Sequence, residues 1–339
     1  MSFSDEDESE DLVDAWISGH AFSDVQASAL EKVLEHDPNR WLDRLRLLGY
    51  YAQQRCDMDR NGEPNAHVVW FIKNQPDACS DIANFALTHR PMVHQGYNAM
   101  KKLWLEQIGR FPTNPTVLRN AAKFFNISDK PLAEETFRKA KLLAPRDYRV
   151  AQDLAHFYEN EARFSTDVEH RQRCSREALR AFEECVELAG NEARRFYALT
   201  DLIEAAGDHF QVERTQEVAA ELFELAKRYQ DDWNYGNAIF YANYALAQIA
   251  FRSEDLDNAG KFLLKASQTP GSPQLDSFGP NFELAQRLLD HGDKATVREY
   301  IVNCAKFWKS GRDRCHKWLK QIETGRDVHL DKHNFYGED

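Results

Sequence analysis

Residues 114–147 read NPTVLRNAAKFFNISDKPLAEETFRKAKLLAPRD, and this stretch decides the fold class. Its small and aromatic residues recur at steps of three and four, which places them on one face of each of two short helices. They are Ala121 and Phe124 in the first helix, and Ala133, Phe137 and Ala140 in the second. Pro131 suits the first turn of the second helix, and Pro145 ends it. The stretch therefore predicts a helical hairpin whose small residues let the two helices approach closely.

The same spacing returns 34 residues further along the chain, where Ala121 corresponds to Ala155 and Phe124 to Tyr158. After a charged insertion within residues 159–177, the pattern of the second helix returns at Ala178, Phe182 and Cys185. Apolar helical runs also end at prolines separated by steps of 38, 36 and 33 residues: Pro38, Pro76, Pro112 and Pro145. A unit that recurs at this length indicates a helical repeat protein.

On these residues the chain resembles the tetratricopeptide-repeat (TPR) superfamily, whose signature has small and aromatic residues at fixed offsets and a proline near its end. Residues 114–147 depart from that signature by carrying Val117 at the position of its tryptophan. The resemblance implies an all-α, right-handed solenoid of stacked helical hairpins. The insertion at 159–177 and the long spacing over 192–229 predict two elongated hairpins in the C-terminal half.

Four regions follow from charge and spacing. Residues 1–9 predict an acidic, disordered tail, because they offer charge and little to bury. Residues 10–112 predict degenerate helical repeats, and residues 113–271 predict TPR-like repeats. Residues 272–339 predict a helical hairpin followed by a basic capping helix.

The net charge of −12 disfavours nucleic acid and an anionic membrane surface as the main partner. The first 14 residues are acidic and carry no base, which is the opposite of a secretory signal. The most apolar stretch, residues 238–251, is too short to span a bilayer. Six scattered cysteines without a close pair favour small buried side chains over a disulfide framework. We therefore expect a cytoplasmic protein that does not associate with membranes.

The sequence contains no G-x-G-x-x-G, P-loop, G-x-S-x-G or H-E-x-x-H motif. Cys304, Cys315 and His316 are the nearest approach to a metal site, but Cys304 lies on the apolar face of a separate helix and no fourth ligand is apparent. Neighbouring carboxylates such as Glu134 and Glu135 point apart on a helix and form no acid–base pair. The sequence thus predicts a chain without enzymatic activity, cofactor or metal.

The TPR resemblance implies that the first helix of each repeat lines an inner groove, which in the family commonly holds an extended peptide or a partner's helix. The residues that would line this mixed polar and aromatic groove are Phe125, Asn126, Arg149, Gln152, His156, Tyr241, Tyr244, Gln248, Phe251 and Arg252. The alternative is that Phe125, Tyr244 and Phe251 pack against neighbouring helices. Chaperone-binding members of the family clamp a carboxylate with Lys, Asn and Arg, and this chain lacks that clamp because Gln152, His156, Tyr244 and Gln248 stand at those positions.

Residues 306–320 carry six cations against the single acid Asp313, with Trp308 and Trp318 among them. Such a helix can bind phosphates, nucleic acid or an acidic peptide, or it can simply cap the array, with its charges in water or against the acidic N-terminus. We favour the cap.

The sequence as a whole predicts a non-enzymatic scaffold for protein–protein interaction. The alternatives are a factor that binds nucleic acid or an acidic partner through the basic helix, and an enzyme or ligand receptor with a pocket between the elongated helices.

Overall fold

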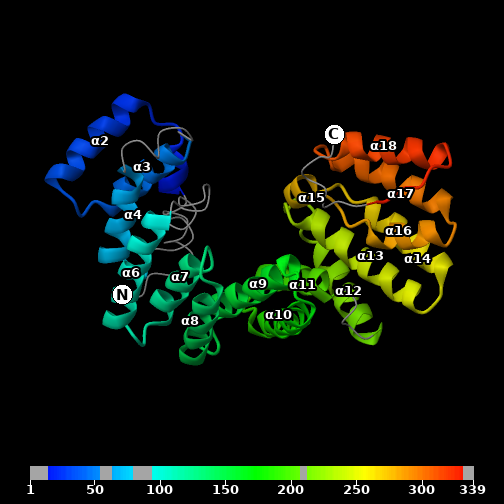
Figure 1. Cartoon of the computed structure of the whole chain (residues 1–339), viewed down its shortest axis with the longest axis horizontal. Coiled ribbons are helices and arrows are strands. Elements are labelled where there is room, and N and C mark those ends of the chain that lie inside the picture. The colour runs from blue at the N-terminus through cyan, green and yellow to red at the C-terminus, as the bar shows by residue number, and fades with distance from the viewer. Residues whose placement is uncertain (1–13, 54–62, 79–93, 207–211, 331–339) are drawn as a thin grey trace. The chain divides into compact units, whose positions relative to one another are not determined.

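The computed structural model describes residues 14–53, 63–78, 94–206 and 212–330. Within these ranges the chain consists of helices joined by turns and contains no strand, which confirms the prediction of an all-α protein (Figure 1). None of the helices in the described ranges is long and apolar enough to cross a membrane. The predicted acidic tail at residues 1–9 lies outside the described residues.

The chain forms two compact units, with the boundary between Phe157 and Tyr158 inside helix α9. In the first unit, helices that follow one another in the chain pack together: α2 on α3, α3 on α4, α4 on α6, α6 on α7, and α7 on α8. Their bounds are α2 Asp24–His36, α3 Trp41–Gln53, α4 Glu63–Asn74, α6 His94–Arg110, α7 Pro115–Phe125, α8 Lys130–Leu143 and α9 Tyr148–Phe164.

In the second unit, consecutive helices also pack together from α10 to α14, and α11 additionally packs on α13 (Figure 1). Near the C-terminus, α17 contacts α14, α16 and α18. The bounds are α10 Val168–Leu188, α11 Glu192–Ala206, α12 Val212–Ala226, α13 Tyr235–Arg252, α14 Leu256–Ser267, α15 Pro273–Phe278, α16 Glu283–Asp290, α17 Lys294–Phe307 and α18 Arg312–Glu323.

The stretch that decides the fold forms α7 and α8. The side chain of Asn114 caps α7 by accepting hydrogen bonds from the backbone N–H groups of Thr116 and Val117, at 3.0 and 3.2 Å. Asp129 caps α8 in the same way through the N–H of Leu132. The small and aromatic residues of the pattern are all buried, namely Ala121, Phe124, Ala133, Phe137 and Ala140. The hairpin is therefore specified locally at its ends and by close packing along its length.

The elongation predicted around the charged insertion is present, since α9 has 17 residues and α10 has 21, compared with 11 in α7 and 14 in α8. Over residues 192–229, where elongation was also predicted, the helices exceed α7 and α8 by less than α9 and α10 do. Both α11 and α12 have 15 residues, and residues 207–211 between them lie outside the described ranges.

Candidate functional site

The polar side of helix α11 is the starting point of the site. Tyr197, Asp201 and Glu204 follow one another at steps of four and three, so they lie on one side of the helix. The opposite side is apolar and buried, through residues such as Leu199 and Leu202. Because the three polar side chains are only partly buried, they remain on an accessible surface of the second unit.

Side chains from α9 and α13 meet this polar side of α11 at Glu204. The guanidinium Nη2 of Arg163 on α9 lies 3.6 Å from Glu204 Oε1 and 3.1 Å from Glu159 Oε1. On the other side, the hydroxyl of Tyr241 on α13 donates a hydrogen bond to the Glu204 carboxylate. One cation is thus shared by two carboxylates, and three helices contribute to a single polar cluster.

This environment changes the ionisation of Glu204. Burial raises the pKa of its carboxyl to about 7, and the negative charges of Glu159 and Asp201 act in the same direction. Arg163 and the hydrogen bond from Tyr241 favour the ionised form but do not offset burial. Burial and the neighbouring Glu204 also raise the pKa of Tyr241 well above 10, so its hydroxyl keeps its proton and stays a donor. A carboxyl with a pKa of about 7 exchanges its proton near neutral pH.

An exposed tryptophan lies beside the other end of the polar side of α11. The hydroxyl of Tyr197 donates to Asp232 Oδ2 at 2.7 Å, and the indole N–H of Trp233 donates to the Tyr197 oxygen. Burial and the bond to Asp232 raise the pKa of Tyr197 to about 12. Trp233 is 54% exposed, although its ring lies 5.8 Å from that of Tyr197. We call Glu159, Arg163, Tyr197, Asp201, Glu204, Trp233, Tyr241 and Gln248 together the α9–α11–α13 face.

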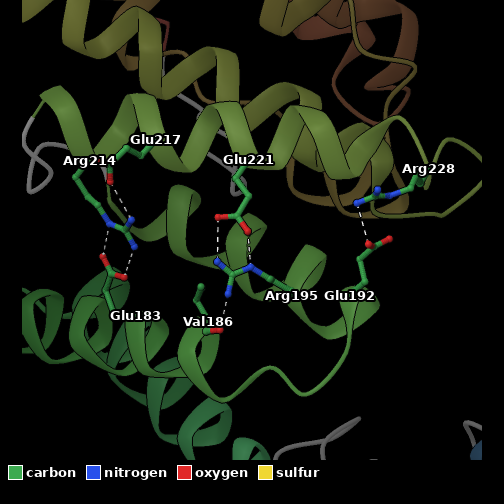
Figure 2. A network of polar contacts seen from close by, with 8 residues as sticks. All are labelled: Glu183, Val186, Glu192, Arg195, Arg214, Glu217, Glu221 and Arg228. Carbon is green, nitrogen blue, oxygen red and sulfur yellow. Dashed lines mark hydrogen bonds and ion pairs between the residues drawn. The ribbon is translucent and has the colours of Figure 1, made fainter.

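Ion pairs on another side of α11 hold it against its neighbours (Figure 2). Arg195 of α11 forms a two-pronged ion pair with Glu221 of α12 and donates to the carbonyl oxygen of Val186 in α10. Arg214 of α12 pairs with Glu183 of α10 through contacts of 2.6 and 3.0 Å. Arg228, just after α12, pairs with Glu192 at the start of α11 at 2.8 Å. These contacts fix the orientation from which α11 presents its polar side.

The groove residues predicted on α13 divide between this face and the core. Tyr241, Gln248 and Arg252 are separated by seven and four residues and lie on one side of the helix. Tyr244 is 5% exposed, and its hydroxyl accepts a hydrogen bond from the backbone N–H of Leu284. Phe251 is half-buried, packs against the core of the second unit and meets His291 edge to face. For Tyr244 and Phe251 the structure matches the packing alternative.

The groove residues predicted in the first unit divide in the same way. Phe125 is fully buried and meets Phe124 edge to face, so a partner cannot reach it without displacing a helix. Asn126 ends α7, and its side-chain oxygen accepts from Lys130 Nζ at 2.7 Å. The residues predicted on α9 share one side of that helix, with the first exposed and the other two half-buried: Arg149, Gln152 and His156.

Arg163, Asp201, Glu204 and Trp233 were not among the predicted groove residues. A signal for two of them was present, because Asp201 and Glu204 interrupt the otherwise apolar run ALTDLIEAA at a spacing of three. Polar residues on one side of an apolar helix are typical of a surface that faces water or a partner. Arg163 and Trp233 carry no such signal, since their positions depend on contacts between elements.

A second cluster resembles a catalytic triad in composition but not in geometry. His170 Nε2 lies 3.4 Å from Cys174 Sγ and 3.4 Å from Glu161 Oε2. A nucleophile, base and acid act in series when the acid binds the ring nitrogen opposite the nucleophile, and here both contact the same nitrogen. Cys174 is also fully buried. The cluster therefore joins α9 to α10 and offers no accessible nucleophile.

The described ranges hold no metal cage, and the hollow described at α10 is an open one. No group of three His, Cys, Asp or Glu side chains within them could hold a metal ion. Cys304 and Cys315 are buried, and burial raises the pKa of both thiols, whereas His316 is exposed. An open hollow at the start of α10 is lined by one helix and its cap: Asp167, Glu169, His170, Gln172, Arg173 and Arg176.

No protein-family model matches the sequence, and a search of curated proteins gives no match.

Proposed function

We propose that this chain is a non-enzymatic scaffold of TPR-like hairpins that binds an extended peptide or a helix of a partner protein along the α9–α11–α13 face. In this interpretation α11 and α13 are the first helices of successive hairpins, and α12 and α14 are their second helices. The contact of α11 with α13, in addition to the contact of each with its sequence neighbours, supports this arrangement. The burial of Ala247 on α13 and Ala259 on α14 supports close packing within a hairpin.

The observation that carries the proposal is the meeting of three helices at Glu204. Arg163, Glu204 and Tyr241 come from three different helices and form one polar cluster on an accessible surface. An oriented polar cluster, with an exposed tryptophan at the other end of the same side of α11, has the composition of an interface, where aromatic anchors supply contact area and polar groups supply specificity. We expect the bound segment to present an apolar side chain to Trp233.

A peptide library displayed on phage and selected on the purified full chain tests the proposal. Affinities of the selected peptides are then measured for Trp233→Ala and for the matched control Phe278→Ala, which removes another exposed aromatic ring of the second unit. We expect Trp233→Ala to weaken binding by about tenfold or more, since exposed aromatic anchors contribute strongly to binding. Both substitutions should lower the melting temperature by a few degrees at most, because both rings are more than half exposed.

Gln248→Ala tests the same face at a second position, because the side chain is half-buried and lies on the same side of α13 as Tyr241. This substitution should also weaken binding of the selected peptides. Tyr244→Ala does not serve this purpose, since loss of a buried ring destabilises the fold. The proposal is wrong if no peptide is selected, if the selected peptides bind Trp233→Ala as well as the unaltered chain, or if Phe278→Ala weakens them equally.

A further inference from the structure

The outer side of the C-terminal helix α18 is basic. The helix packs on the core through Cys315, Trp318 and Ile322, which are separated by three and four residues. Exposed basic side chains occupy the other side and the turn before it; we call Lys309, Arg312, His316, Lys317 and Lys320 the α18 basic face. Asp313 is the acid that shares this side of the helix.

Among the residues that the structure describes, no carboxylate pairs with the lysines or the arginine of this face. Some other exposed cations of the second unit do pair with acids, as Arg287 does with Glu283 at 2.6 Å. Within the described ranges, Lys309, Lys317 and Lys320 form no ion pair. Glu323, the acid at the end of α18, is instead held by Arg298 at 2.8 Å. Several like charges are thus held near one another on one helix, and an added anion would relieve their repulsion.

The face rests on a rigid base. Trp308 and Trp318 pack together with Phe282, and the Phe282 ring lies 4.8 Å from that of Trp318. The turn before α18 is fixed by the backbone N–H of Lys309, which donates to Asp276 Oδ1 at 2.7 Å. Gly311 allows this turn to approach the tryptophan, because a Cβ atom there would lie 2.1 Å from the Trp308 ring. The backbone positions of the cations are therefore set before any partner binds.

Three features favour a peptide over nucleic acid as the partner. Trp308 and Trp318 are 1% and 5% exposed, so neither ring can stack on a base. The part of the face on the helix, from Arg312 to Lys320, extends about 12 Å at about 1.5 Å per residue, a length that roughly four residues of extended peptide cover. The net charge of −12 repels a dense polyanion more strongly than a short acidic peptide.

We propose that the α18 basic face binds a carboxylate-rich peptide segment of a partner protein. Aspartate and glutamate side chains of that segment pair with Lys309, Arg312, Lys317 and Lys320. This interaction uses a different element from the α9–α11–α13 face and does not depend on it. The chain itself contains a segment of the required chemistry, SDEDESED at residues 4–11, which supplies a probe.

Fluorescence anisotropy with a labelled SDEDESED peptide tests the proposal. The protein is the full chain with the six acids of residues 5–11 changed to the corresponding amides, so that its own segment does not compete. We expect saturable binding that weakens with added salt and falls by about tenfold or more in Lys317→Glu/Lys320→Glu. The matched control is Lys102→Glu/Lys139→Glu, which changes the net charge equally at exposed positions of α6 and α8. This control should bind as the parent does, and circular dichroism should show all variants folded.

Three outcomes would overturn the proposal. The first is no saturable binding of the peptide. The second is an equal loss of affinity in the control variant, which would show a response to net charge alone. The third is tighter binding of a short DNA duplex or of phosphatidylserine vesicles than of the peptide, with the same sensitivity to Lys317→Glu/Lys320→Glu, which would assign the face to phosphate-bearing partners.

Discussion

Glu204 shows how a single residue couples the packing of this protein to pH. Its side chain is 17% exposed, and it faces Glu159 and Asp201 with one guanidinium, that of Arg163, to compensate them. The protein accommodates this carboxyl by raising its pKa from the ordinary value of 4.5 to about 7. Protonation of Glu204 removes one of the two negative charges that compete for Arg163, so that Arg163 pairs with Glu159 alone.

The raised pKa predicts a loss of stability with rising pH. The folded chain holds the proton of Glu204 more tightly than the unfolded chain does. The contribution of this proton to the free energy of unfolding is therefore complete below about pH 4.5 and is lost as pH rises through about 7. The loss by about pH 8 is on the order of 3 kcal/mol. We expect Glu204→Gln to reduce the fall in the free energy of unfolding between about pH 5 and pH 8, and to make the chain more stable than the parent at the upper end.

Urea unfolding followed by circular dichroism across this range measures the effect. Glu213→Gln, an exposed substitution on α12, is the control and should follow the parent chain. If Glu204→Gln retains the pH dependence of the parent chain, Glu204 is not the group that titrates.

At the scale of the helices, ion pairs complement the apolar packing of α10, α11 and α12. The pairs Arg195–Glu221 and Arg214–Glu183 are both two-pronged and connect different helices (Figure 2). Two parallel N–H···O bonds restrict the rotation of one helix against the other more than a single contact does. The two ion pairs therefore fix how the helices are rotated against one another, and they add a small amount to the free energy of unfolding.

A double-mutant cycle on Arg214→Ala and Glu183→Ala should give a coupling free energy of about 0.5 to 1 kcal/mol, which decreases with added salt. The side chains are 39% and 32% exposed, so solvent screens much of their attraction. The reference is the cycle on Lys227→Ala and Glu224→Ala. These two side chains are three residues apart in the sequence and 64% and 70% exposed, so they should couple weakly or not at all. Equal coupling in the two cycles, measured by urea unfolding, would contradict a role for Arg214 and Glu183 in helix register.

At the scale of the whole molecule, the reactivity of the buried cysteines shows whether the packed helices separate. Cys174, Cys185, Cys304 and Cys315 are reduced and at most 1% exposed. Burial raises the pKa of Cys304 well above 9 and that of Cys315 to about 12, so the reactive thiolate is scarce at both. A thiol reagent can reach these side chains only when helices separate.

We therefore expect iodoacetamide to modify these four cysteines slowly in native buffer and rapidly in denaturing urea. Peptide mass spectrometry assigns the rate to each cysteine, and Cys56 and Cys79, outside the described residues, are followed separately. Because the four thiols lie in the core of the second unit, urea should accelerate their modification in parallel with the loss of helix. Rapid native labelling of Cys304 or Cys315 would contradict the packing of α17 and α18 described above.

The TPR-like pattern predicted the helices better than it predicted the groove. Ala121, Phe124 and Phe137 identified two helices and their buried sides, because spacing within one helix determines which side chains share a face. The same reasoning placed Phe125 and Tyr244 in the groove, with packing against neighbouring helices as the alternative, and both are buried. A helix with apolar residues on more than one side contacts several neighbours, and spacing within that helix does not reveal how many it has.

The sequence by itself determined that this protein is all-α and where helices such as α7 and α8 begin and end, because caps, prolines and apolar periodicity act over only a few residues. Only the tertiary structure decided that Arg163, Glu204 and Tyr241 meet, and that Trp308 and Trp318 lie beneath the α18 basic face. Burial, ion pairing and pKa shifts depend on which distant segments pack together. That choice is made by the complementary surfaces of whole helices.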